Sequence, residues 1–117
     1  MHDDRFTPLM EAVLAKDREA VRSLLEQGAD PDVHDTDQEW TALHLAARGN
    51  DAAIVKLLLD YGAEVDSVDT FGNTPLWRAM FEGADDAIAL LLEHGADPGR
   101  KNHSGVSPQD LSRGDRR

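Results

Sequence analysis

The stretch Thr41-Ala42-Leu43-His44-Leu45-Ala46-Ala47 decides the fold of this 117-residue chain, because its opening recurs along the sequence. Shortened versions begin at Thr7, Thr74 and Ser107, so the pattern returns every 33 or 34 residues. A fixed period of this length is the signature of a protein built from stacked repeats. We therefore expect a single domain made of repeated structural units.

A second pattern keeps the same period. Gly-Ala followed by an acidic residue begins at Gly28, Gly62 and Gly95, each 21 residues after its Thr. Between the two landmarks, every repeat carries a Val or Ile followed three residues later by a pair of leucines. The one extra residue of the longer repeat falls between Gly28 and Thr41, in a polar segment of loop character.

Each landmark suits a pair of short helices. The Thr hydroxyl can cap the free N–H groups of a first helix, and a following Pro is pre-set for the first helical position. The Gly of the second landmark can end a second helix in a left-handed conformation. Helices this short are not stable alone in water, so neighbouring repeats must bury the leucine stripes. The chain is therefore expected to be an all-α solenoid.

These residues resemble the ankyrin repeat, whose Thr-Pro-Leu-His-x-Ala pattern is similar to the stretch from Thr41 to Ala47. The resemblance implies an ankyrin-like stack of helix-turn-helix units with projecting β-hairpin-like fingers, and it implies that His44 ties neighbouring turns together. The chain departs from the family pattern by having Met10 and Trp77 in place of His, and Arg5, Glu39, Lys16 and Asn50 in place of Gly. The shape of the finger between Asp32 and Trp40 stays open.

The repeats divide the chain, residues 1–117, into units of one domain. Three full repeats are expected at about 7–40, 41–73 and 74–106, followed by a truncated capping unit at 107–113. The last unit should supply one short helix from Pro108 to about Arg113, after which the chain frays.

Composition limits the classes of partner. The chain has 23 acidic and 12 basic residues, and its formal charge of −11 argues against nucleic acid, which demands clustered Lys and Arg. A basic protein partner is expected, although the charge can equally serve solubility alone. With no cysteine, no membrane-length apolar run and no signal-peptide pattern, the chain is expected to be cytoplasmic, away from membranes and monomeric when free.

Catalytic and metal-binding patterns are not found in the sequence. It contains no phosphate-binding loop, nucleophile elbow or His-Glu-x-x-His motif, so we expect no enzyme activity, catalytic residue or cofactor. The acidic run from Asp30 to Glu39 could be a calcium loop or a solvated finger. His34 and Asp35 stand where a calcium loop wants an acidic or amide residue and a Gly, so no metal is expected.

The ankyrin resemblance implies that the first helices and the fingers line a concave face whose outward positions are free to contact a partner. Five of the six aromatic residues fall on this face or its edge, and the repeat core does not need them. For Trp77 we expect partial packing, whereas Trp40 and Phe71 are expected to be contact residues. The predicted partner-binding residues are Asp37, Gln38, Trp40, Arg48, Thr70, Phe71, Asn73, Trp77, Arg78, Phe81 and Glu82.

Two functions follow from these patterns. The first is a non-catalytic module that binds a partner protein, expected to be basic, through an acidic, aromatic-bearing concave face. Such a module would act as an inhibitor or immunity-type protein. The second is a structural or assembly solenoid that self-associates through its end units. Acidic first and second fingers, opposed to a third with Arg100 and Lys101, would steer a basic partner.

Overall fold

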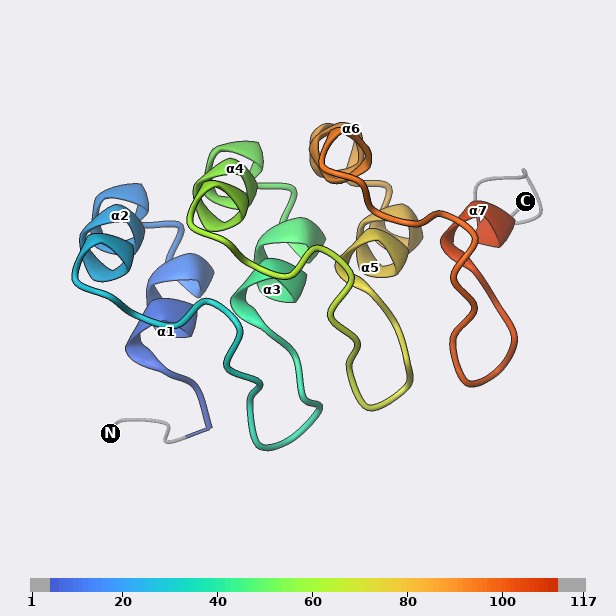
Figure 1. Cartoon of the computed structure of the whole chain (residues 1–117), viewed down its shortest axis with the longest axis horizontal. Helices are drawn as coiled ribbons and strands as arrows, with labels where there is room; N and C mark the ends of the chain where they lie inside the picture. Colours follow the sequence, from blue (N-terminus) through green and yellow to red (C-terminus); the bar gives the residue numbers. More distant parts are fainter. Residues whose placement is uncertain (1–4, 112–117) are drawn as a thin grey trace.

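The protein is a stack of helix pairs, seen in a computed structural model that describes residues 5–111. Helices α1 (Pro8–Leu14), α3 (Ala42–Arg48) and α5 (Pro75–Glu82) form one row, and α2 (Arg18–Glu26), α4 (Ala52–Asp60) and α6 (Asp85–Glu93) form a second row above it (Figure 1). The short α7 (Pro108–Leu111) extends the first row, and loops project below it. The prediction of an all-α repeat solenoid is confirmed. The expected continuation of the last helix to Arg113 and the fraying beyond it lie outside the described residues.

The first helix of each pair begins where the repeat pattern predicts. The Oγ1 atoms of Thr7, Thr41 and Thr74 accept hydrogen bonds from backbone N–H groups three residues later, at 3.1, 3.3 and 3.1 Å. Proline occupies the first turn of α1 and α5, where its missing N–H costs nothing. The second helices α2 and α4 are capped by Asp17 and Asp51 in the same way.

The turn within each pair needs a left-handed residue. Gly83 adopts this conformation with φ of 71°, and Lys16 and Asn50 adopt it with φ of 57° and 55° although they carry side chains. Such a conformation costs a non-glycine residue about 1–2 kcal/mol. The two substitutions of the family's inter-helix Gly therefore keep the geometry of the turn and lose some stability.

The core runs through the stack as layers of aliphatic side chains. Leu43, Ile54, Val55, Leu58, Leu76 and Leu91 are among the side chains that are essentially inaccessible to solvent. In α3 every residue from Ala42 to Ala47 is buried, because this helix has a neighbouring pair on each side. Within residues 5–111, no helix has the length and apolar character needed to cross a membrane.

The projecting fingers are loops, each closed by one backbone hydrogen bond at its base. Asp35 N–H donates to Trp40 O at 2.8 Å, Asp69 N–H to Asn73 O at 3.1 Å and Asn102 N–H to Val106 O at 2.9 Å. No strand is assigned in the described part of the chain, so the β-hairpin-like shape is not confirmed. The first of these closures spans one more residue than the other two, which places the extra residue of the first repeat at the tip of its finger.

Side-chain oxygens shape these fingers from within. Oδ1 of Asp35 accepts the backbone N–H groups of Asp37, Gln38 and Glu39 at 2.9, 2.8 and 2.9 Å. Oδ1 of Asp69 and Oδ1 of Asn102 each accept two N–H groups in the equivalent places. Neighbouring fingers are joined by Thr70 N–H to Gln38 O and His103 N–H to Phe71 O, at 2.9 and 3.0 Å. In the acidic run, the carboxylate of Asp35 thus stabilises the turn of the first finger.

Candidate functional site

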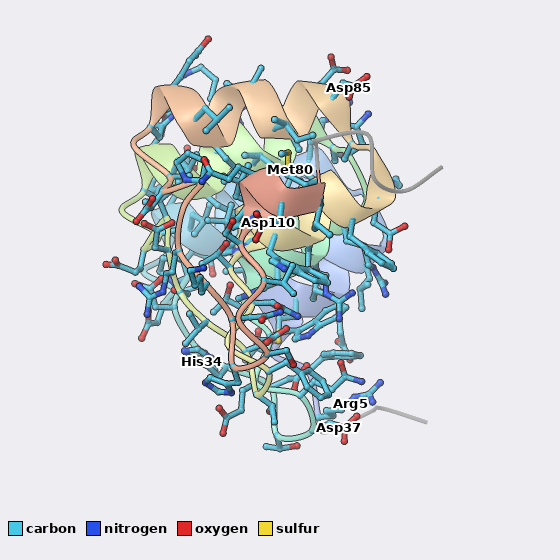
Figure 2. The ribbon with its side chains drawn as sticks, turned by 90° about the vertical axis from the view of Figure 1, so that its right-hand side faces the viewer. Arg5, His34, Asp37, Met80, Asp85 and Asp110 are labelled. Carbon is cyan, nitrogen blue, oxygen red and sulfur yellow. The ribbon has the colours of Figure 1, made fainter. Side chains whose placement is uncertain are left out.

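A hollow of about 280 Å³ lies between α1, the first finger and α3. Its lining residues are Arg5, Phe6, Leu14, Asp35, Asp37, Gln38, Trp40, Leu45 and Arg48. On the α5 side the Arg78 guanidinium lies over the ring of Trp40, which lines the hollow. We call this hollow, together with Trp77, Arg78 and Phe81, the groove. In Figure 2, Arg5 and Asp37 lie together on one side of the fingers, joined at 3.1 Å, and His34 lies on the other.

Trp40 is buried in the floor of the groove, which corrects the expectation that it is an exposed contact residue. Only 7% of the residue is accessible, and its ring stacks on His44 with centroids 6.3 Å apart. Its carbonyl accepts the Asp35 N–H at the base of the first finger, and the guanidinium groups of Arg48 and Arg78 cover its ring. Its indole Nε1 has no hydrogen-bond partner among residues 5–111.

Asn73 is also buried, at 4% accessible, so it is not free to contact a partner as predicted. Its carbonyl accepts hydrogen bonds from His44 Nε2 at 2.8 Å and from Asp69 N–H at 3.1 Å. Its side-chain oxygen accepts Asn102 Nδ2 at 2.8 Å, which joins the second and third fingers. These bonds give Asn73 a structural role.

His44 links the second and third units, as the family resemblance implies. Thr41 N–H donates to Nδ1 at 3.1 Å, so the ring proton resides on Nε2 and is donated to the Asn73 carbonyl. The ring is fully buried, and this burial lowers the pKa of His44 from 6.5 to about 4, although the bond to Asn73 opposes the shift. The neutral imidazole is therefore the form that the fold requires at neutral pH.

Two arginines meet on the Trp40 ring. The Cζ atoms of Arg48 and Arg78 lie 4.9 and 4.8 Å from its centroid, and Arg78 also lies 5.4 Å from the Trp77 ring. Neither guanidinium forms a salt bridge within the described residues, and Nε of Arg78 is buried without a hydrogen-bond partner. We call Trp40, Arg48, Trp77 and Arg78 the arginine–tryptophan cluster. The sequence patterns placed both arginines on the outward side of their helices but did not bring them together.

The remaining predicted contact residues are more accessible. Phe71 in the second finger and Phe81 on α5 are each 54% exposed, and Asp37, Gln38, Arg48, Thr70 and Glu82 are exposed as well. Trp77 and Arg78 are half-buried. The Trp77 ring stacks on Phe81 with centroids 5.4 Å apart and planes 11° from parallel, so contact with Trp77 restrains the Phe81 ring.

The carboxylates of the fingers are divided between structure and surface. Asp35 and Asp69 are buried, while Oδ1 atoms of Asp32 and Asp66 accept the N–H groups of Glu64 and Asp97 in the next repeat. No group of His, Asp or Glu within residues 5–111 has an arrangement suited to holding a metal ion. The acidic run from Asp30 thus serves the shape of the finger and its link to the next repeat.

Short antiparallel helix pairs with Thr caps, stacked in one direction and joined by projecting fingers, define a helical-repeat solenoid whose groove is its distinctive surface. A sequence model of ankyrin repeats, in three copies, matches residues 9–102, and the chain belongs to the ankyrin-repeat family. Ankyrin repeats generally mediate protein–protein interaction and are typically non-catalytic. Comparison of the sequence with curated proteins gave no match.

Proposed function

We propose that this chain is a non-catalytic protein-binding module that holds its partner in the groove. The observation that carries the proposal is Phe81, a large aromatic side chain of the groove that remains 54% exposed while stacked on Trp77. An exposed ring held in one orientation loses little freedom on binding, and clustered aromatic and arginine side chains dominate binding energy at protein interfaces. Phe71, on the second finger, extends the same contact surface.

The proposed partner has a basic surface. The chain carries a formal charge of −11, and Asp37, Glu39 and Glu64 are exposed on the first two fingers and their bases. A field of this sign speeds the encounter with a positively charged protein more than it strengthens the final complex. A small acidic module that covers a basic protein's surface would act as an inhibitor or immunity-type protein.

The proposal is tested by selecting peptides from a randomised display library against the purified protein and measuring how tightly they bind its variants. Phe81→Ala and Phe71→Ala should each weaken binding by about 2 kcal/mol, or roughly 30-fold, because each removes a ring from the centre of the contact. Tyr61→Ala is the matched control, since Tyr61 is an aromatic residue at the end of α4, 41% exposed and outside the groove.

Circular dichroism of each variant shows whether the helices are retained. Binding that is equally tight for the parent, Phe81→Ala and Phe71→Ala proteins would contradict the groove as the binding surface. Sedimentation over a range of protein concentrations examines the alternative of self-assembly, which requires the parent protein to associate. A strict monomer is the result expected for a partner-binding module.

A further inference from the structure

We propose that the arginine–tryptophan cluster is a receptor for one carboxylate, supplied by an Asp or Glu side chain of the bound protein. The inference rests on the proposed function, because it names the chemistry of the contact at the centre of the groove. The arginine–tryptophan cluster is a local positive site within a protein that is acidic as a whole. A basic partner would thus present a single acidic residue to this point of the groove.

The two guanidinium groups are held in place before any partner arrives. Arg48 and Arg78 come from different repeats, and each lies within about 5 Å of the centroid of the same buried Trp40 ring. Arg78 is further restrained by the Trp77 ring at 5.4 Å. A guanidinium packed on a ring still has N–H groups around its edge, arranged as a fork that matches a carboxylate. Restraint by the rings lowers the entropy cost of forming those bonds.

The two arginines form no ion pair with the acidic residues around them in the described chain. The acidic residues that line the groove are engaged elsewhere, since the Asp35 carboxylate turns the finger and Asp37 pairs with Arg5 at 3.1 Å. Neither Arg48 nor Arg78 forms a salt bridge within residues 5–111. Two like charges placed side by side without a salt-bridge partner provide a site for an anionic group.

Unsatisfied donors gather at the same place. Nε of Arg78 and the indole Nε1 atoms of Trp40 and Trp77 are buried and lack hydrogen-bond partners in the part of the chain that the structure describes. Buried donors are nearly always paired in native proteins, and an orphan group costs about 1–3 kcal/mol. An oxygen acceptor entering the cluster could satisfy some of these donors after a small shift of the rings.

A carboxylate suits the cluster better than a phosphate. A planar carboxylate carries one charge and matches a guanidinium fork, whereas a phosphate brings nearly two charges into a protein whose net charge is −11. The exposed ring of Phe81, stacked on Trp77, and the exposed side chain of Leu14 border the site, so apolar residues should flank the acidic one. The occupant is therefore an Asp or Glu within an otherwise apolar or basic segment.

The test uses the display-selected peptides and a double-mutant cycle. The selected peptides should share an Asp or Glu at one fixed position relative to an apolar residue. Changing that residue to its amide should weaken binding to the parent protein about tenfold or more, and Arg78→Gln should do the same. In the Arg78→Gln protein the difference in affinity between the acidic and the amide peptide should be clearly smaller than in the parent protein, because only Arg48 remains to bind the carboxylate. Arg78→Lys should restore part of the affinity, because it keeps the charge and loses the fork.

Arg100→Gln is the matched control for net charge, since Arg100 is exposed on the third finger, and it should leave the difference between the two peptides unchanged. The amide peptide is measured on the parent protein, so this arm remains valid even if an arginine variant is less stable. Peptides that depend on Phe81 but have no acidic position would overturn the carboxylate receptor and leave the proposed function standing. Peptides indifferent to both Phe81 and Phe71, or a library without binders, would contradict both. Tighter binding when phosphoserine replaces the acidic residue would overturn the assignment to carboxylate.

Discussion

The second and third helix pairs share one backbone pattern but use it differently. Three residues after the capping Thr, the second pair has His44, whose two ring nitrogens bond to Thr41 and Asn73. The third pair has Trp77 at that position, and its ring nitrogen has no partner among residues 5–111. The residues of α3 up to Ala47 are buried, whereas α5 exposes Phe81 over Trp77. The comparison indicates that the same repeat position can serve the stack in one unit and the binding surface in the next.

The largest expected effect is the loss of the His44 link. His44→Ala should lower the free energy of unfolding by roughly 4 kcal/mol, because it leaves a cavity, removes the partner of Thr41 N–H and removes one of the two partners of the Asn73 carbonyl. Trp77→Ala should cost only about 2 kcal/mol, since the ring is half-buried and makes no hydrogen bond through its nitrogen. Urea unfolding followed by circular dichroism measures both. Equal losses would remove the distinction drawn between the two units.

The second expected effect is a dependence of the free energy of unfolding on pH, caused by His44 in the second unit. Burial lowers the pKa of His44 to about 4 from 6.5, so between these values the unfolded chain binds more protons than the folded one. Stability should therefore be full above pH 6.5 and fall as the pH drops towards 4, by about 3 kcal/mol for this one group.

Unfolding free energies measured from pH 7.5 to pH 4 test this dependence. The His44→Ala protein is the control, because the same titration should change its stability much less within this window. A parent protein whose stability is flat between pH 6.5 and pH 4.5 would show that the imidazole is not held in its neutral form.

Much of this architecture could be predicted from the sequence, because it depends on residues close together in the chain. The capping threonines, the Leu stripes and the helix-ending glycines all act within one repeat, and the helices begin at Pro8, Ala42 and Pro75 as their positions imply. The burial of Trp40 could not be predicted in the same way. It depends on Arg48 of α3 and Arg78 of α5, from two successive repeats, meeting on the indole. A repeat alignment assigns a role to a position and gives no account of which side chains meet across repeats.

The fingers of the two units differ at the residue two places before the capping Thr. The second finger has Gly72 there, with φ of 80°, while the first has Glu39 with φ of 62°. Both are left-handed, because the chain must turn back towards α3 or α5 at this point. The family's usual Gly is thus replaced in the first finger without a change of conformation, and Glu39 carries the strain.

The smallest expected changes in the free energy of unfolding come from substituting these two residues, by placing Gly at position 39 and a side chain at position 72. Glu39→Gly should raise the free energy of unfolding by about 1 kcal/mol, because relief of the left-handed strain exceeds the entropy that glycine adds to the unfolded chain. The backbone bonds of Glu39 are kept in the variant: its N–H donates to Asp35 Oδ1, and its carbonyl accepts from His34 Nδ1. Thermal unfolding of the parent and the variant at neutral pH is sufficient to measure the difference.

Gly72→Ala should lower stability by about 2 kcal/mol, since it adds the same strain and places a Cβ 2.8 Å from His103 Cδ2 and 3.1 Å from His103 N in the third finger. Gly105→Ala separates the two causes, because its φ of 81° is nearly the same and a Cβ there meets nothing within 4 Å. Its loss should be the strain alone, about 1 kcal/mol. If Gly72→Ala and Gly105→Ala cost the same, the close approach of neighbouring fingers contributes nothing to the difference. If Glu39→Gly also fails to stabilise the protein, the first finger is not strained at that residue.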